Sequence, residues 1–210
     1  MTNESSSDSD LKNAIQHFRF VLDQCPVGHL DRVAALTNLA RARLQDHICN
    51  DVQDINSTIF LFRDALALRP KGHSDHTSDH YLDNLACSLK SRFNHQSKSG
   101  DLNEAFALFH QVLRLRFVGH KCRDISSNNL AGALQSRFKQ RNEIKDINKT
   151  INLFRMALAL CLTRHPRRYA VLNNLAVALD TRYQELQTSE DLDEAIDRYR
   201  ESLRLTQHSH

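Results

Sequence analysis

The sequence has few of the residues that shape turns and sheets. Its 210 residues include 5 Gly, 3 Pro and no Trp, and aromatic residues make up only 7%. A β-sandwich or barrel of this length needs many more turn residues, so an all-β fold is disfavoured. The abundant Leu and Ala residues favour helices instead, and an apolar content of 40% is enough for a folded core.

The sequence also lacks a cysteine framework, the pattern of a signal peptide and a long apolar run. No two of its five Cys form a Cys-x-x-Cys pair, which argues against disulfides or a zinc ribbon and favours a reducing compartment. The N-terminus has no basic and apolar regions of a signal peptide, and no apolar run approaches the ~20 residues of a membrane helix. With a net charge of +3, we expect a cytoplasmic or nuclear protein that binds neither nucleic acid nor membranes.

The dominant feature of the chain is an internal repeat of about 45 residues. An Asn-Leu-Ala motif recurs with spacings of 46, 45 and 45 residues, at Asn38, Asn84, Asn129 and Asn174. An Asp followed by Leu or Ile recurs with spacings of 44, 47, 45 and 45 residues, at Asp10, Asp54, Asp101, Asp146 and Asp191. A His keeps a similar period, at His29, His73, His120 and His165. Three independent markers with one period indicate a repeat protein.

Each repeat unit predicts two helices. Apolar residues 1, 5, 8 and 12 positions after each marker Asp lie on one helical face. We expect the Asp to be the N-cap of this helix, and Glu104 and Glu194 to complete capping boxes. Gly28, Gly72 and Gly119 suit a left-handed turn after it. The Asn-Leu-Ala segments form the other helix, which ends at an Arg-aromatic pair in three copies, with Arg92, Arg137 and Arg182.

The repeat therefore predicts an all-α solenoid of about nine helices over residues 10–206. A lone helix at 10–24 is followed by four helical hairpins, at 31–69, 75–117, 122–162 and 167–206. A single hairpin cannot bury its apolar face, so neighbouring units must stack. We expect residues 1–9 to form a disordered arm and residues 207–210 a tail. Polar His17 and Arg198 replace the Leu of interior copies, which predicts polar end helices and a monomer.

These motifs resemble tetratricopeptide repeats. One helix of the unit carries a small residue, at Ala40, Ala86, Ala131 and Ala176, and the other carries an aromatic, at Phe18, Phe62, Phe109, Phe154 and Tyr199. The period exceeds the usual 34 residues by about 11. With its Gly-His and Asn-Asn-Leu-Ala motifs, it looks like the kinesin-light-chain type and the fungal arrays joined to caspase-like CHAT domains. The resemblance implies a right-handed superhelix with a concave groove.

The resemblance implies a non-catalytic scaffold that binds an extended peptide or a partner protein in this groove. The candidate site is the Asn ladder, which comprises Asn38, Asn84, Asn128, Asn129, Asn173 and Asn174. A side-chain amide both donates and accepts hydrogen bonds, so these residues could bind a peptide backbone, or alternatively hold neighbouring repeats together. A second hypothesis is a regulatory or sensory fragment of an effector assembly with a CHAT domain, which a neighbouring caspase-like reading frame would favour.

Other candidate sites are weaker. A carboxylate clamp is disfavoured because Arg41 is the one basic residue within a turn of the ladder's Asn-Leu-Ala positions. The Arg residues that recur in the second helix are expected to pair with acidic neighbours. His76, His80 and Asp83 have zinc-like spacing, but we expect no metal or other cofactor. No catalytic motif is present, so we expect no enzyme, and the recurring His should cap the hairpin junctions.

Overall fold

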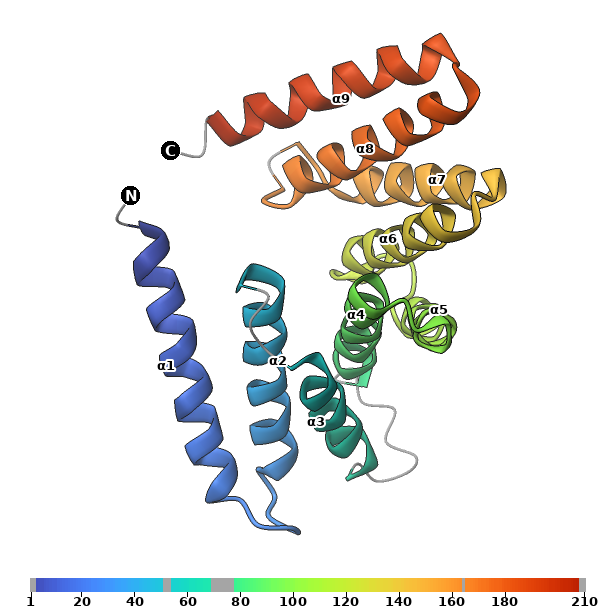
Figure 1. Ribbon diagram of the computed structural model, residues 1–210. Coiled ribbons are helices and arrows are strands. Elements are labelled where there is room, and N and C mark those ends of the chain that lie inside the picture. The colour runs from blue at the N-terminus through green and yellow to red at the C-terminus, as the bar shows by residue number, and fades with distance from the viewer. Residues whose placement is uncertain (1–2, 51–53, 69–77, 164, 208–210) are drawn as a thin grey trace. The chain divides into compact units, whose positions relative to one another are not determined.

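The computed structural model describes residues 3–50, 54–68, 78–163 and 165–207. Within these ranges the regular structure consists of nine α-helices and no strands (Figure 1). The helices are α1 (Asn3–Asp23), α2 (Arg32–Asn50), α3 (Ile55–Ala67), α4 (Ser78–Gln96), α5 (Ser99–Leu115), α6 (Arg123–Arg141), α7 (Ile144–Leu160), α8 (Arg168–Leu186) and α9 (Ser189–Gln207). The predicted all-α repeat architecture is therefore confirmed.

The main difference from prediction lies at the N-terminus. Helix α1 begins at Asn3, so residues 3–9 continue the helix instead of forming an irregular arm. Composition alone predicted disorder for this segment because it is short, polar and poor in apolar residues.

The structure divides into two compact units, Met1–Leu108 and Phe109–His210, with the boundary inside α5. We call them unit 1 and unit 2. In unit 1, α1 packs on α2, α2 on α3 and α3 on α4, and in unit 2, α6 packs on α7, α7 on α8 and α8 on α9, as expected for a repeat array.

The core is formed at the positions that the repeat pattern predicts. The four small residues of the Asn-Leu-Ala helices are fully buried, at Ala40, Ala86, Ala131 and Ala176. Small side chains at these positions allow neighbouring helices to approach closely. In unit 2, Phe154 of α7 packs with Leu175 and Leu179 of α8 and with Ala195 of α9. Tyr199 of α9, at the aromatic position of the last repeat, is partly buried against this cluster.

A bidentate Arg–Asp ion pair joins the two helices of each of the last three hairpins. In each pair the guanidinium donates two hydrogen bonds to the carboxylate, at 2.6 and 2.7 Å from Arg92 to Asp101, at 2.6 and 2.6 Å from Arg137 to Asp146, and at 2.7 and 2.5 Å from Arg182 to Asp191. All three carboxylates are buried, and Asp146 is completely inaccessible. Hydrogen bonding to the carboxylate raises the pKa of each arginine above its ordinary value.

These pairs change the predicted start of the helices. Asp54 is the N-cap of α3 and accepts a hydrogen bond from the Asn56 N–H at 2.9 Å. Asp101, Asp146 and Asp191 instead lie inside the first turn, so their prediction as N-caps was wrong. The backbone N–H of each of these three donates to a carbonyl three residues earlier, and the helix starts three residues sooner than an Asp N-cap would allow. Their carboxylates are consequently directed to the arginine of the preceding helix.

The predicted capping boxes are also replaced by contacts between repeats. Glu104 accepts a hydrogen bond from Arg63 at 2.7 Å, and Glu194 accepts one from Arg155 at 2.5 Å. Both contacts connect the second helices of successive hairpins, α3 with α5 and α7 with α9. The expectation that the recurring arginines pair with acidic neighbours is confirmed for Arg63 and Arg155.

A left-handed residue ends each helix that carries the paired arginine. Ser97, Asn142 and Gln187 have φ of 53°, 51° and 55°, and they lie 45 residues apart. The backbone N–H of each donates to the carbonyl of the aromatic residue after the arginine, at 2.7 Å in all three copies. The arginine side chain therefore bonds to the Asp that follows the turn, and the backbone carbonyl of the aromatic residue accepts a hydrogen bond from the turn itself.

The recurring histidine caps the turn between hairpins, as predicted, at the three described copies. Its Nδ1 accepts from the backbone N–H two residues later, at 3.1 Å for His29 and Asp31, 3.2 Å for His120 and Cys122, and 3.3 Å for His165 and Arg167. Gly28 and Gly119 precede the first two of these copies with φ of 93° and 94°, where glycine is favoured. His73 and Gly72 lie outside the described residues.

Removing one partner of the buried pair should destabilise the protein strongly. Arg137→Met leaves the Asp146 carboxylate, which is completely buried, without its cation. We expect the free energy of unfolding in urea to fall by about 3–5 kcal/mol, as for other broken buried ion pairs. Arg200→Met is the control, because Arg200 and Asp197 are both about two-thirds exposed, and it should cost less than about 1 kcal/mol. Equal losses in the two variants would contradict the importance of the pair.

Acid should weaken the last hairpin. The Arg182 guanidinium holds the pKa of Asp191 below its usual value, against the opposing effect of burial, and Thr188 adds a further hydrogen bond. A lowered folded-state pKa contributes stability that is complete above the usual pKa of aspartate, about 4, and is lost as the pH falls through the folded-state value. The difference in unfolding free energy between wild type and Asp191→Asn should therefore shrink as the pH drops below about 4. A difference independent of pH would contradict this assignment.

Candidate functional site

In unit 1, two members of the Asn ladder line a cavity of about 540 Å³. Asn38 lies on α2 and is exposed, while Asn84 lies on α4 and is half-buried. The remaining lining residues come from α1 (Leu11, Ala14 and Phe18), from α2 (Arg41, Ala42, Leu44, Gln45 and Ile48) and from α4 (Cys87). The cavity thus combines an apolar wall with three side-chain amides and a single charged side chain.

In unit 2, the ladder makes a contact of its own. Asn174 of α8 donates a hydrogen bond from Nδ2 to Oδ1 of Asn128 of α6 at 3.0 Å. Both side chains are half-buried, as is Asn129, whereas Asn173 is exposed. Part of the ladder therefore joins successive repeats, through a side chain of the neighbouring helix.

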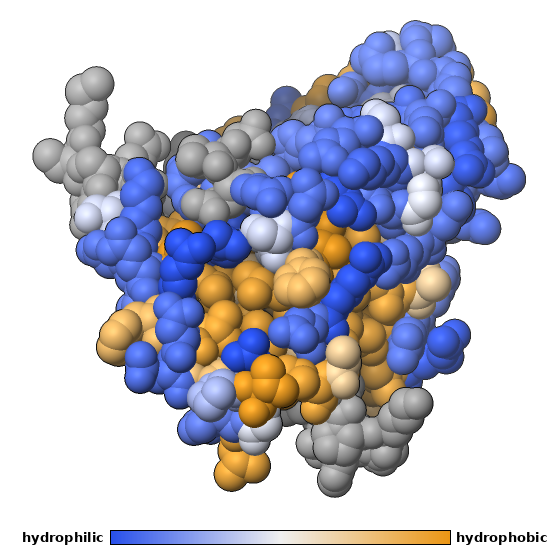
Figure 2. Space-filling model, turned by 60° about the horizontal axis from the view of Figure 1, so that its bottom comes forward, coloured by the Kyte–Doolittle hydropathy of each residue, from blue (hydrophilic) through white to orange (hydrophobic). Residues whose placement is uncertain are grey.

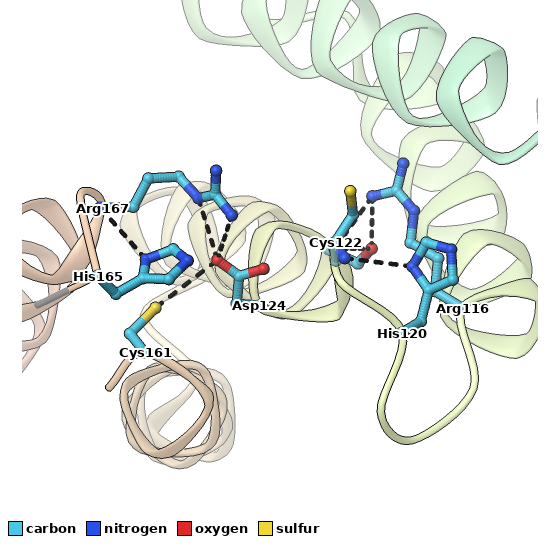
Figure 3. A network of polar contacts seen from close by, with 8 residues as sticks. Arg116, His120, Cys122, Asp124, Cys161, His165 and Arg167 are labelled. Atoms are coloured by element: carbon cyan, nitrogen blue, oxygen red, sulfur yellow. Dashed lines mark hydrogen bonds and ion pairs between the residues drawn. The ribbon is translucent and has the colours of Figure 1, made fainter. Parts of the chain in front are cut away.

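The predicted metal-binding triplet is only partly described. His76 lies outside the described residues, His80 is exposed and Asp83 is buried. A different group comes together in unit 2, where Asp124, Cys161 and His165 each place a potential ligand atom within 4.8 Å of the others (Figure 3). Asp124 is in the first turn of α6, Cys161 follows α7, and His165 is in the turn before α8.

Hydrogen bonds hold this cluster around the buried Asp124 carboxylate. Arg167 donates to Asp124 Oδ2 from Nε and Nη2, both at 3.0 Å, and the Cys161 thiol faces the same oxygen at 3.6 Å. Burial, together with the negative charge of Asp124, raises the pKa of the Cys161 thiol. A catalytic cysteine needs the opposite shift, so this Cys–His–Asp arrangement is not that of an activated nucleophile.

A second cavity, of about 430 Å³, lies in unit 2 among α7, α8 and α9. Three arginines line it, but each is paired with a glutamate, at 2.5 Å for Arg155 and Glu194, 2.7 Å for Arg168 and Glu201, and 3.1 Å for Arg198 and Glu201. The cavity therefore offers little unbalanced positive charge to an anion.

Sequence reasoning missed one recurring arginine. Arg32, Arg123 and Arg168 are the first residues of α2, α6 and α8. Each guanidinium donates to a backbone carbonyl seven residues earlier, that of Cys25, Arg116 or Cys161. A cation is favourable at the end of the preceding helix, where carbonyls lack partners. In the sequence, these arginines could have been found because each lies three residues after the marker histidine.

Several large apolar side chains remain exposed, and apolar areas are visible between hydrophilic residues in the space-filling view (Figure 2). Ile48, which lines the unit 1 cavity, is 63% exposed. No helix in the described part of the chain combines the length and apolar character needed to cross a membrane.

Comparisons with known proteins agree with this architecture. No family model and no curated protein matches the chain. Solved structures do match, among them a putative kinesin light chain of Podosopora anserina with nearly identical TPR-like repeats, at 19% identity and a TM-score of 0.61, covering 91% of this chain and 88% of that one. A variant of that protein with one substituted residue matches with 19% identity and a TM-score of 0.63, covering 94% and 91%.

A third structure is BtubC (BKLC) from P. vanneervenii, with 18% identity and a TM-score of 0.56, covering 100% of this chain and 76% of that one. At such low identity these matches establish architecture, and the protein has the fold of TPR-like helical repeats.

Proposed function

We propose that the protein is a non-catalytic interaction scaffold and that the unit 1 cavity binds an extended segment of a partner protein. The observation that carries this proposal is the position of Asn38 and Asn84 beside an apolar wall, in a cavity of about 540 Å³. Binding pockets commonly have about 300–1,000 Å³ and combine apolar walls with a few polar groups.

The chemistry of the cavity favours a bound peptide segment that has an extended backbone and an apolar side chain. Phe18, Leu11 and Ile48 offer apolar surface, and the amides of Asn38 and Asn84 can each donate to a peptide carbonyl and accept from a peptide N–H. Extended segments leave these backbone groups free. Arg41 is the single charged lining residue and favours an acidic residue in the bound segment.

The test uses peptides selected from a random phage-displayed library on the immobilised full chain. Affinities of synthetic copies are then measured by fluorescence anisotropy for wild type and Asn38→Ala/Asn84→Ala. We expect at least a tenfold loss, equivalent to about 1.4 kcal/mol, because two lost hydrogen bonds are together worth about 1–3 kcal/mol.

The matched control is Asn173→Ala, which removes an exposed member of the same ladder in unit 2. Its affinity for the selected peptides should equal that of wild type. If the double variant keeps its helical circular-dichroism spectrum and binds the peptides unchanged, the unit 1 cavity is not the binding site. An equal loss in the control would contradict the proposal as well.

A further inference from the structure

The cluster of Asp124, Cys161 and His165 is not used by the proposed peptide site, which lies in unit 1. Its three side chains come from two helix ends and one turn of unit 2, so the fold brings together residues 37 and 41 positions apart in the sequence. Asp124 and Cys161 are buried, while His165 is half-buried. Among the described residues, this is the one group of three such side chains with ligand atoms within 4.8 Å.

We infer that Asp124, Cys161 and His165 form a binding site for a divalent transition-metal ion, with Zn²⁺ as the ion that the ligands fit best. Cys sulfur, His nitrogen and a carboxylate oxygen are the three ligand types that zinc takes in proteins. Three protein ligands leave a fourth tetrahedral position, which a water molecule can fill from the half-exposed side of His165.

The spacing of the cluster is close to a tetrahedral edge. Zinc binds sulfur at about 2.3 Å and oxygen at about 2.1 Å, so these two ligands lie about 3.6 Å apart in a tetrahedral site. The Cys161 sulfur and Asp124 Oδ2 are 3.6 Å apart. His165 lies within 4.8 Å and needs to move inward by roughly 1 Å.

Arg167 supplies the positive charge that neutralises the buried Asp124 carboxylate. It donates two hydrogen bonds to the Asp124 carboxylate, yet its own side chain is 45% exposed. A metal ion would take over the neutralisation of the carboxylate, and the guanidinium would turn to solvent. The proton of the Cys161 thiol would leave to solvent on binding, because the thiolate is the ligand. Arg167 is therefore a competitor of the metal.

Metal binding would also alter the turn before α8. His165 Nδ1 accepts from the Arg167 backbone N–H at 3.3 Å, and Figure 3 shows the other ring nitrogen on the side that faces Asp124. A ring whose Nδ1 accepts this hydrogen bond has its N–H on the other nitrogen. When it coordinates a metal, the proton moves to Nδ1, and the Arg167 N–H loses its acceptor. The backbone N–H of Arg167 consequently reports on occupancy.

Two other copies in the described part of the chain differ from this one at the equivalent positions. In the preceding copy, Arg116 takes the place of Cys161 and donates from Nη1 to Ser126 Oγ at 2.8 Å, so a fixed cation lies where the thiol would be (Figure 3). Cys25 and His29 repeat the spacing of Cys161 and His165. Their pair is not part of a three-residue group of this kind among the described residues.

The experiment titrates the full chain, reduced with a phosphine, with Co²⁺ as a spectroscopic probe. We expect one equivalent to bind, with a thiolate-to-cobalt absorption band that Zn²⁺ abolishes. Cys161→Ser should remove the band, and Asp124→Asn or His165→Ala should weaken binding at least tenfold. Arg167→Gln should tighten it at least threefold. Cys25→Ser is the matched control and should leave the titration unchanged.

An independent measurement covers the case in which a variant fails to fold. In the wild-type protein, Zn²⁺ should slow alkylation of Cys161 at least tenfold, measured by mass spectrometry, and should shift the amide resonance of Arg167. Absence of a thiolate band at millimolar Co²⁺, a band that persists in folded Cys161→Ser, or alkylation of Cys161 at an unchanged rate would each overturn the site. Because the peptide assay depends on unit 1 residues, its result is independent of this one.

Discussion

The Arg–Asp pair between the two helices of a hairpin organises the repeat. Its carboxylate is buried, so it requires a cation in place, and the planar guanidinium satisfies both oxygens in one geometry. Arg92 and Arg182 each add a third hydrogen bond, to Asn56 and Asn148 of the preceding hairpin. Each of these two side chains thus joins the two helices of one hairpin and contacts the previous hairpin. In the first hairpin Asp46 takes the arginine position, and Arg43 reaches Ser57 at 2.7 Å instead.

The repeat period was sufficient to predict the helices and most of the core, because both depend on local apolar spacing. The aromatic residues Phe62, Phe109 and Phe154 are at most 1% exposed, as their helical faces predict. The role of Asp101, Asp146 and Asp191 was predicted wrongly for a physical reason. An N-cap and a residue in the first turn look alike in sequence, and only the arginine nine residues earlier distinguishes them.

The candidate sites depend more strongly on tertiary structure. Asn38 and Asn174 occupy the same repeat position, yet one lines a cavity and the other bonds to Asn128. The difference comes from the neighbouring helix, which periodicity does not reveal. Asp124 could not be identified as a candidate ligand for the same reason, since its proximity to Cys161 and His165 requires α6 to lie against the end of α7. Repetition in sequence therefore identifies a position, and its neighbours determine what that position does.

The left-handed residues at the hairpin turns have a consequence for engineering. Ser97 and Gln187 adopt a left-handed conformation that costs most L-residues roughly 1–2 kcal/mol, whereas Asn142 tolerates it better. Glycine has no such cost there, although it loses more chain entropy on folding. The two effects oppose each other, and glycine gains most at the exposed positions 97 and 187, where the residue present is not an asparagine. When the array is lengthened by design, glycine could be placed at this turn position in each added repeat, without altering the buried pair beside it.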